Sequence, residues 1–181
     1  MSNSRIAYRY ALAVLGVAEE TQKLDVVFTD FGLIEKLLTE VREFSLFLKS
    51  PVIKSLKKKR VLTELLKPRV SELTLAFVLL LTSKDRENLL LDVIRAFYKL
   101  RDKKLGILQV TTHTAVPFAL AQKEQLVSKL TAVTKKNVKI EYVVDSSLRG
   151  GFTVQFEDTV WDASVKRQLE LIEQRFIEGI A

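Results

Sequence analysis

The period of the hydrophobic pattern changes near residue 105, and this change constrains the fold more than any other feature. Residues 1–105 space apolar side chains as amphipathic helices do, with few breaks at glycine or proline (Gly16, Gly32, Pro51 and Pro68). Residues 106–181 contain stretches that alternate apolar and polar side chains, which is typical of half-buried strands. The sequence therefore predicts an α + α/β chain, with an N-terminal six-helix bundle over 1–105 and a small C-terminal β-α-β-β-α domain over 106–181.

In the first half, spacing and breakers predict helices over residues 4–19, 53–66, 71–82 and 86–103. A further helix is expected after Thr21, which is placed to cap it, with apolar side chains at helical spacing (Leu24, Phe28, Phe31, Ile34, Leu38 and Val41). Between these helices, Phe44–Leu48 is expected to form a short apolar turn that ends at Ser50 and Pro51 and counts as the third of the six helical elements.

In the second half, strands are predicted over 107–112, 138–144 and 152–156, with a helix opened by Pro117 after the first of them. Gly150 and Gly151 indicate a tight turn or a bulge. A short edge strand is expected at Val160-Trp161. Either Asp162 or Ser164 is then expected to cap a last helix, whose apolar stripe consists of Val165, Leu169, Ile172 and Phe176.

The residue content argues against an enzyme. The chain has no cysteine, which excludes disulfides, a thiol nucleophile, an iron–sulfur cluster and a zinc ribbon. Its single histidine, His113, lies between threonines without a neighbouring Ser or Asp motif, so a structural role is favoured. The sequence contains neither of the two glycine-rich phosphate-binding motifs, G-x-x-x-x-G-K-[ST] and G-x-G-x-x-G. We therefore expect no catalytic residue, no cofactor and no metal site.

The net charge of +7 is confined to the first half of the chain. A basic run from Lys54 to Arg69 supplies most of it, and its densest part forms a candidate basic patch (Lys54, Lys57, Lys58, Lys59 and Arg60). A nucleic-acid-binding adaptor is one interpretation, but the run lacks the interleaved aromatic side chains that stack on bases. A solvated helix face, or a contact with an acidic protein surface, is favoured. If neutralising residues 57–60 left both assembly and its salt dependence unchanged, the contact with an acidic surface would be contradicted.

Two of the predicted helices are more apolar than a surface helix needs to be. Residues 73–81 are apolar almost all round: one face (Leu75, Val78 and Leu79) can fill the core, and the other (Leu73, Ala76 and Leu80) must also be hidden. The first helix carries two neighbouring stripes, one of Ile6, Tyr10, Ala13 and Val17 and one of Ala7, Ala11, Leu15 and Ala18. Either these helices are wrapped by their neighbours, or they form a groove for an apolar helix of a partner.

These features resemble the delta subunit of F-type ATP synthase, whose mitochondrial counterpart is the oligomycin-sensitivity-conferring protein. The resemblance covers essentially the whole chain and is carried by five segments: Ile6–Ala13, Phe47–Ile53, Arg86–Phe97, Val138–Phe156 and Asp162–Leu169. The segment from 138 to 156 is the most specific, because alternating apolar residues lead through a compact motif (Asp145, Leu148, Gly150 and Gly151) into the next strand.

The resemblance implies a non-catalytic stator linker of a proton-translocating ATP synthase, peripheral on the cytoplasmic face of a bacterial inner membrane or at the equivalent place in an organelle. Residues 1–105 would bind the N-terminal helix of the alpha subunit, and residues 106–181 would bind the C-terminal region of the b subunit in the peripheral stalk. Other F1 subunits are further expected partners. No nucleic acid and no membrane insertion are implied. Tyr10, Ala13 and Leu80 match groove positions of the family, and helical geometry adds Val14, Val17, Leu73 and Ala76.

Overall fold

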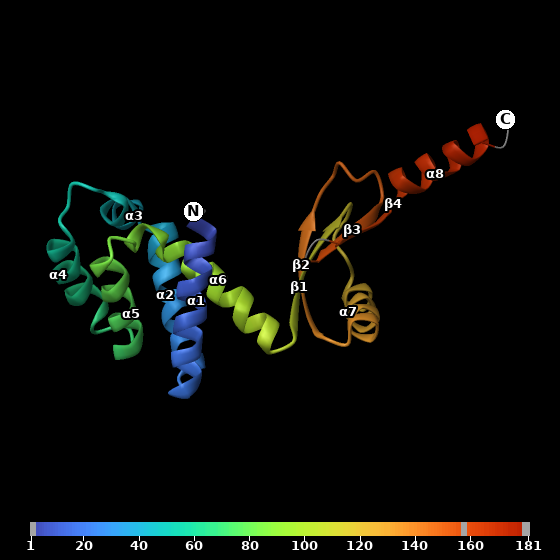
Figure 1. Cartoon of the computed structure of the whole chain (residues 1–181). Helices are drawn as coiled ribbons and strands as arrows, with labels where there is room; N and C mark the ends of the chain where they lie inside the picture. The colour runs from blue at the N-terminus through green and yellow to red at the C-terminus, as the bar shows by residue number, and fades with distance from the viewer. Residues whose placement is uncertain (1–2, 157–158, 179–181) are drawn as a thin grey trace. The chain divides into compact units, whose positions relative to one another are not determined.

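The computed structural model describes residues 3–156 and 159–178, and the chain divides into two compact units between Arg101 and Asp102. The N-terminal unit consists of helices, and the C-terminal unit contains a sheet and two helices (Figure 1). This arrangement confirms an α+β fold. The division falls inside the last helix of the first half, rather than after that helix at residue 105.

The helices of the N-terminal unit follow one another closely along the chain. They are α1 (Asn3–Glu20), α2 (Leu24–Glu40), α3 (Arg42–Lys49), α4 (Ser55–Leu66), α5 (Glu72–Ser83), the 3-10 turn η1 (Glu87–Leu89) and α6 (Leu90–Lys104).

Two local predictions in this unit are wrong. Residues 44–48 belong to the helix α3, because Phe44 and Leu48 are four positions apart and both enter the core. Thr21 does not cap α2: its hydroxyl donates to the carbonyl of Val17, 2.7 Å away, and so belongs to the end of α1. Lys23 occupies the N-cap position of α2 without a side-chain hydrogen bond.

The core of the N-terminal unit gathers residues from helices far apart in the sequence. The rings of Phe31 and Phe97 meet edge to face, with their centroids 4.9 Å apart. A polar clamp joins α2 to α5: the carboxylate of Asp30 accepts hydrogen bonds from the backbone N–H and the hydroxyl of Ser71, at 2.9 and 2.7 Å. The Ser71 oxygen in turn accepts from the N–H of Thr74 and caps α5. The clamp therefore fixes the start of the most apolar helix.

The C-terminal unit is a four-stranded sheet with the strand order β2-β1-β3-β4. Its elements are β1 (Ile107–Thr114), α7 (Leu120–Thr134), β2 (Asn137–Val144), β3 (Gly151–Phe156), β4 (Thr159–Ser164) and α8 (Val165–Glu178). Strands β1 and β2 are parallel, and β3 is antiparallel to both β1 and β4. The parallel pair requires a crossover, which α7 supplies. Its Leu130 is buried with Leu108, Val110, Val138 and Val154 in the core of this unit.

The predicted element order omitted a full fourth strand. The edge strand expected at 160–161 extends over the whole of β4, because it pairs with β3 from residue 151 to residue 156. The cap of α8 is Ser164, whose hydroxyl accepts from the N–H of Arg167 at 3.2 Å. The carboxylate of Asp162 accepts instead from the N–H of Ser164. Pro117 does not open α7, which begins after Ala119.

Gly151 is required by both its backbone conformation and its surroundings. Its φ angle is +79°, and a Cβ atom there would lie 2.3 Å from the carbonyl oxygen of Ala163 on the paired strand. We expect Gly151→Ala to destabilise the C-terminal unit by about 3 kcal/mol or more, since strain and clash add. The fluorescence of Trp161, the only tryptophan of the chain, reports thermal unfolding of this unit.

Gly106→Ala is the matched control for this substitution. Gly106 also has a positive φ angle, +64°, but a Cβ atom there would meet no heavy atom within 4 Å. The control should cost only the strain of about 1 kcal/mol. Equal unfolding midpoints for the two variants would contradict a role for the close approach to Ala163.

Candidate partner-docking surfaces

Helix α1 buries one of its two apolar stripes and leaves the other at the surface. The stripe that contains three alanines and one leucine is buried (Ala7, Ala11, Leu15 and Ala18). On the second stripe, Ile6 and Tyr10 are half-buried, whereas Ala13 and Val17 are exposed. The alanines allow neighbouring helices to pack closely against the buried side of α1. The side that carries Ala13 and Val17 is not covered and remains available to a partner.

A hollow of about 450 Å³ lies on this outer side of α1. Its lining combines apolar side chains of α1 (Ile6, Tyr10 and Ala13) with the side chains of Arg9 and Arg86. Arg86 comes from the turn between α5 and η1. The tertiary structure therefore adds two cations to a surface that sequence reasoning treated as purely apolar.

Helix α5 also leaves apolar side chains in contact with water. Its enclosed face consists of Thr74, Phe77, Val78, Leu81 and Thr82. Of the predicted core face, only Val78 is fully buried, and Leu75 and Leu79 are half-buried. Ala76 is exposed and Leu80 is 48% exposed, while Leu73 is half-buried. Apart from Leu73, the stripe that the sequence placed on the outside of α5 is therefore more accessible to water than the stripe that it placed in the core.

One predicted groove residue is not available to a partner. Val14 is 3% exposed, because it lies beside Ala11 and Ala18 on the inward side of α1 and forms part of the core. Tyr10 and Ala13 line the same hollow. Arg9 could have been found from the sequence, since it lies one turn before Ala13 on the same helix. No sequence signal indicated Arg86.

One residue of the predicted basic patch is buried in the core. The ammonium group of Lys58, 3% exposed, donates to the carboxylate of Glu87 and, at 2.8 Å, to the carbonyl of Leu48. Its prediction as a surface cation is wrong, because position 58 faces the inside of the unit together with Leu62. Lys54, Lys57 and Arg60 are exposed and Lys59 is half-buried.

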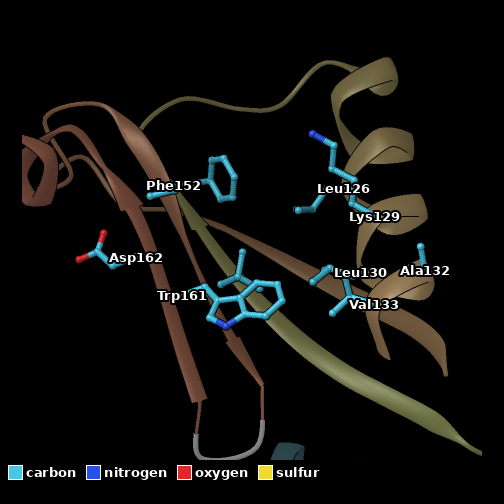
Figure 2. A pocket seen from close by; sticks show the side chains of 10 residues that line it. Leu126, Lys129, Leu130, Ala132, Val133, Phe152, Trp161 and Asp162 are labelled. Carbon is cyan, nitrogen blue, oxygen red and sulfur yellow. The ribbon is translucent and has the colours of Figure 1, made fainter. Parts of the chain in front are cut away.

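The C-terminal unit has an apolar hollow of its own, of about 480 Å³, between α7 and the strands β3 and β4. Figure 2 shows the rings of Phe152 and Trp161 directed from the sheet toward α7, while Leu130 and Val133 reach toward them from the helix. The carboxylate of Asp162 points away. Val133 is 66% exposed and Trp161 is 43% exposed. Helix α7 thus leaves the β3–β4 side of this sheet face open.

Helix α8 presents a second apolar surface in this unit. The predicted apolar stripe does lie on one helix. None of its side chains is buried, and Leu169 is 54% exposed and Phe176 is 68% exposed. A helix with an apolar stripe of this kind gains its stability by packing the stripe against another surface.

The compact motif from the most specific segment forms the turn between β2 and β3. Hydrogen bonds from the hydroxyl of Ser147 and from its backbone N–H, the latter 2.9 Å long, hold the pKa of the Asp145 carboxyl below its usual value. Leu148 is half-buried, and its N–H donates to the carbonyl of Asp145. The Gly150 carbonyl accepts from the N–H of Val165 and anchors the start of α8. The motif thus has a structural role.

Neither unit shows the features of a reaction centre within residues 3–156 and 159–178. No group of three or more His, Asp or Glu side chains there is placed to hold a metal ion. Burial and the neighbouring carboxylate of Glu35 raise the pKa of Tyr98 to about 12, which keeps this phenol neutral. Its ring packs edge to face against Phe28, so the side chain has a packing role.

No helix among the described residues is long and apolar enough to cross a membrane.

Comparisons with known proteins agree on one family. The family model described as ATP synthase delta (OSCP) subunit matches residues 6–176. "ATP synthase subunit delta" of Chloroherpeton thalassium is 36% identical over 178 residues, covering 98% of this chain and 97% of that protein. Its counterpart in Chlorobaculum parvum is 38% identical over 177 residues, with 98% of each chain covered.

A solved structure has the same fold. A chain in the cryo-EM structure of the Toxoplasma gondii mitochondrial ATP synthase hexamer superposes with a TM-score of 0.71 at 22% identity. The match covers 94% of this chain and 97% of that one.

Proposed function

The chain belongs to the ATP synthase delta (OSCP) subunit family, a family of non-catalytic ATP synthase subunits, and on this premise we propose that it is a stator linker. In this role the N-terminal unit binds the N-terminal helix of the alpha subunit, and the C-terminal unit binds the b-subunit peripheral stalk. The joint holds the catalytic hexamer against the torque of the rotor during proton-driven ATP synthesis. The subunit works at the cytoplasmic face of a bacterial inner membrane.

The observation that carries the proposal is that each unit exposes an apolar surface beside a hollow. Exposed apolar side chains are ordinary when they are scattered, but a contiguous apolar hollow indicates an interaction site. In the N-terminal unit this surface is the outer side of α1, with Tyr10 and Ala13. In the C-terminal unit it is the space between α7 and β3–β4, with Val133 and Trp161.

An amphipathic helix suits the N-terminal surface. A helix that lays its apolar face into a groove is anchored by residues spaced three and four positions apart. Ala13 leaves room in the hollow, and the half-buried ring of Tyr10 offers a broad apolar wall. Leu80 and Ala76 of α5 are exposed as well, but they do not line this hollow. Isothermal titration of the full-length chain with the N-terminal segment of its alpha subunit tests this half of the proposal.

The hollow of the C-terminal unit suits a stalk helix for the same reason. We expect Val133→Asp to weaken binding of the C-terminal segment of the b subunit by about ten-fold or more, because docking would bury a carboxylate in an apolar site. Calorimetry with the full-length chain measures the loss. Val133 is 66% exposed, so the substitution should leave the fold intact.

Leu120→Asp is the matched control for the stalk contact. Leu120 is an exposed apolar residue of the same helix, but it does not line the hollow. This variant should bind the stalk segment as the parent does. A loss of equal size in both variants, or none in Val133→Asp, would contradict docking in the hollow.

A further inference from the structure

The hollow on α1 is lined by two cationic side chains. Within the described part of the chain, the guanidinium groups of Arg9 and Arg86 have neither an ion-pair partner nor a side-chain hydrogen bond, although both line this apolar space. Helix α1 carries no acidic side chain before Glu19, so Arg9 has none within a helical turn. The hollow therefore combines apolar walls with two positively charged side chains.

Two acidic residues flank Arg86 in the sequence. Asp85 is exposed and forms no ion pair with Arg86 in the described part of the chain, and the carboxylate of Glu87 faces the core. Glu87 is 6% exposed, and its carboxylate accepts a hydrogen bond from the buried ammonium group of Lys58. The pair turns the negative charge toward the interior of the unit, while Arg86 lies at the hollow. The fold thus separates the charges of Glu87 and Arg86 and leaves the guanidinium group of Arg86 available to a partner.

Resting on the proposed docking of the alpha-subunit helix, we propose that Arg9 and Arg86 select a carboxylate on the docked helix. A guanidinium group matches the two oxygens of an aspartate or glutamate side chain, and the bond strengthens when docking excludes water. A helix with only apolar residues on this face would instead bury two unpaired cations, which is costly. The arginines therefore act as specificity-determining residues in a site whose affinity comes from apolar contact.

Isothermal titration of the full-length chain tests the proposal from both sides of the contact. The ligands are the N-terminal segment of the alpha subunit encoded with this chain and the same segment with each Glu and Asp replaced by Gln and Asn. We expect Arg9→Gln and Arg86→Gln each to weaken binding of the unmodified segment by about ten-fold or more. The amide-substituted segment should bind the parent and both variants equally weakly, because the coupling has been removed.

Arg42→Gln is the control, since Arg42 is exposed on α3 and does not line the hollow. Arg9 is exposed, so Arg9→Gln keeps its fold even if Arg86→Gln disturbs the turn beside Glu87, and thermal unfolding checks both. Equal affinity of the parent, Arg9→Gln and Arg86→Gln would overturn the selection of a carboxylate while leaving the docking site in place. The same conclusion would follow if the parent chain bound the amide-substituted segment as tightly as the unmodified one. Absence of binding by the parent chain would instead overturn the proposed docking, and this inference with it.

Discussion

Lys58→Met should lower the free energy of unfolding of the N-terminal unit by about 3–5 kcal/mol, because it leaves the charge of Glu87 buried without its partner. The carboxylate accepts from Lys58 through one oxygen, and its other oxygen, Oε2, has no hydrogen-bond partner among the described residues. The substitution also removes the donor to the Leu48 carbonyl. Urea denaturation followed by far-UV circular dichroism measures the loss.

Two further variants separate the buried charge from other effects of removing a lysine. Lys57→Met removes the same charge from an exposed neighbour on the same helix and should change stability by less than about 0.5 kcal/mol. Lys58→Met combined with Glu87→Met replaces the pair by apolar side chains and should recover most of the loss. If Lys57→Met and Lys58→Met were equally stable, the ion pair would not support this unit.

Ala13→Asp should reduce binding of the alpha-subunit N-terminal segment by about 100-fold or more, because it places a charge where the hollow needs room and an apolar surface. The new carboxylate would also lie one helical turn from Arg9 and compete for that guanidinium group. Ala13 is exposed in the free chain, so the substitution should not unfold the unit. Calorimetry gives the affinity, and circular dichroism gives the fold.

Leu12→Asp provides the comparison for Ala13→Asp. Leu12 is an exposed apolar residue on the same helix, 52% accessible, and it does not line the hollow. We expect this variant to bind the segment with parental affinity. Docking on this side of α1 would be excluded if Ala13→Asp also bound normally.

The element types were largely predictable because they depend on local spacing. The alternating residues from 138 to 144 form β2 as expected, and the apolar run at 73–81 lies within α5. Errors concentrated in short segments. Residues 44–48 were too few to show a helical period, and β4 was underestimated because most of its side chains are exposed and carry a weak alternating signal.

The candidate site was predictable only in part. The two unusually apolar helices could be identified, and Tyr10 and Ala13 do share a hollow. The placement of Val14 at the surface was wrong, because a helical period gives the angles between side chains but not the direction of the core. Two adjacent apolar stripes on α1 fit the same period, and the neighbouring helices decide which stripe is buried.

By itself, the sequence determined the change from helices to a sheet, the absence of cysteine chemistry, and the resemblance to one family, because each of these depends on residue types and short-range spacing. Only the tertiary structure decided which charges of the basic N-terminal unit remain at the surface. Lys58 is buried against Glu87, which lies 29 positions away, whereas Arg86 is left at the hollow on α1. A contact between residues so far apart arises from the packing of whole helices, which no local pattern encodes.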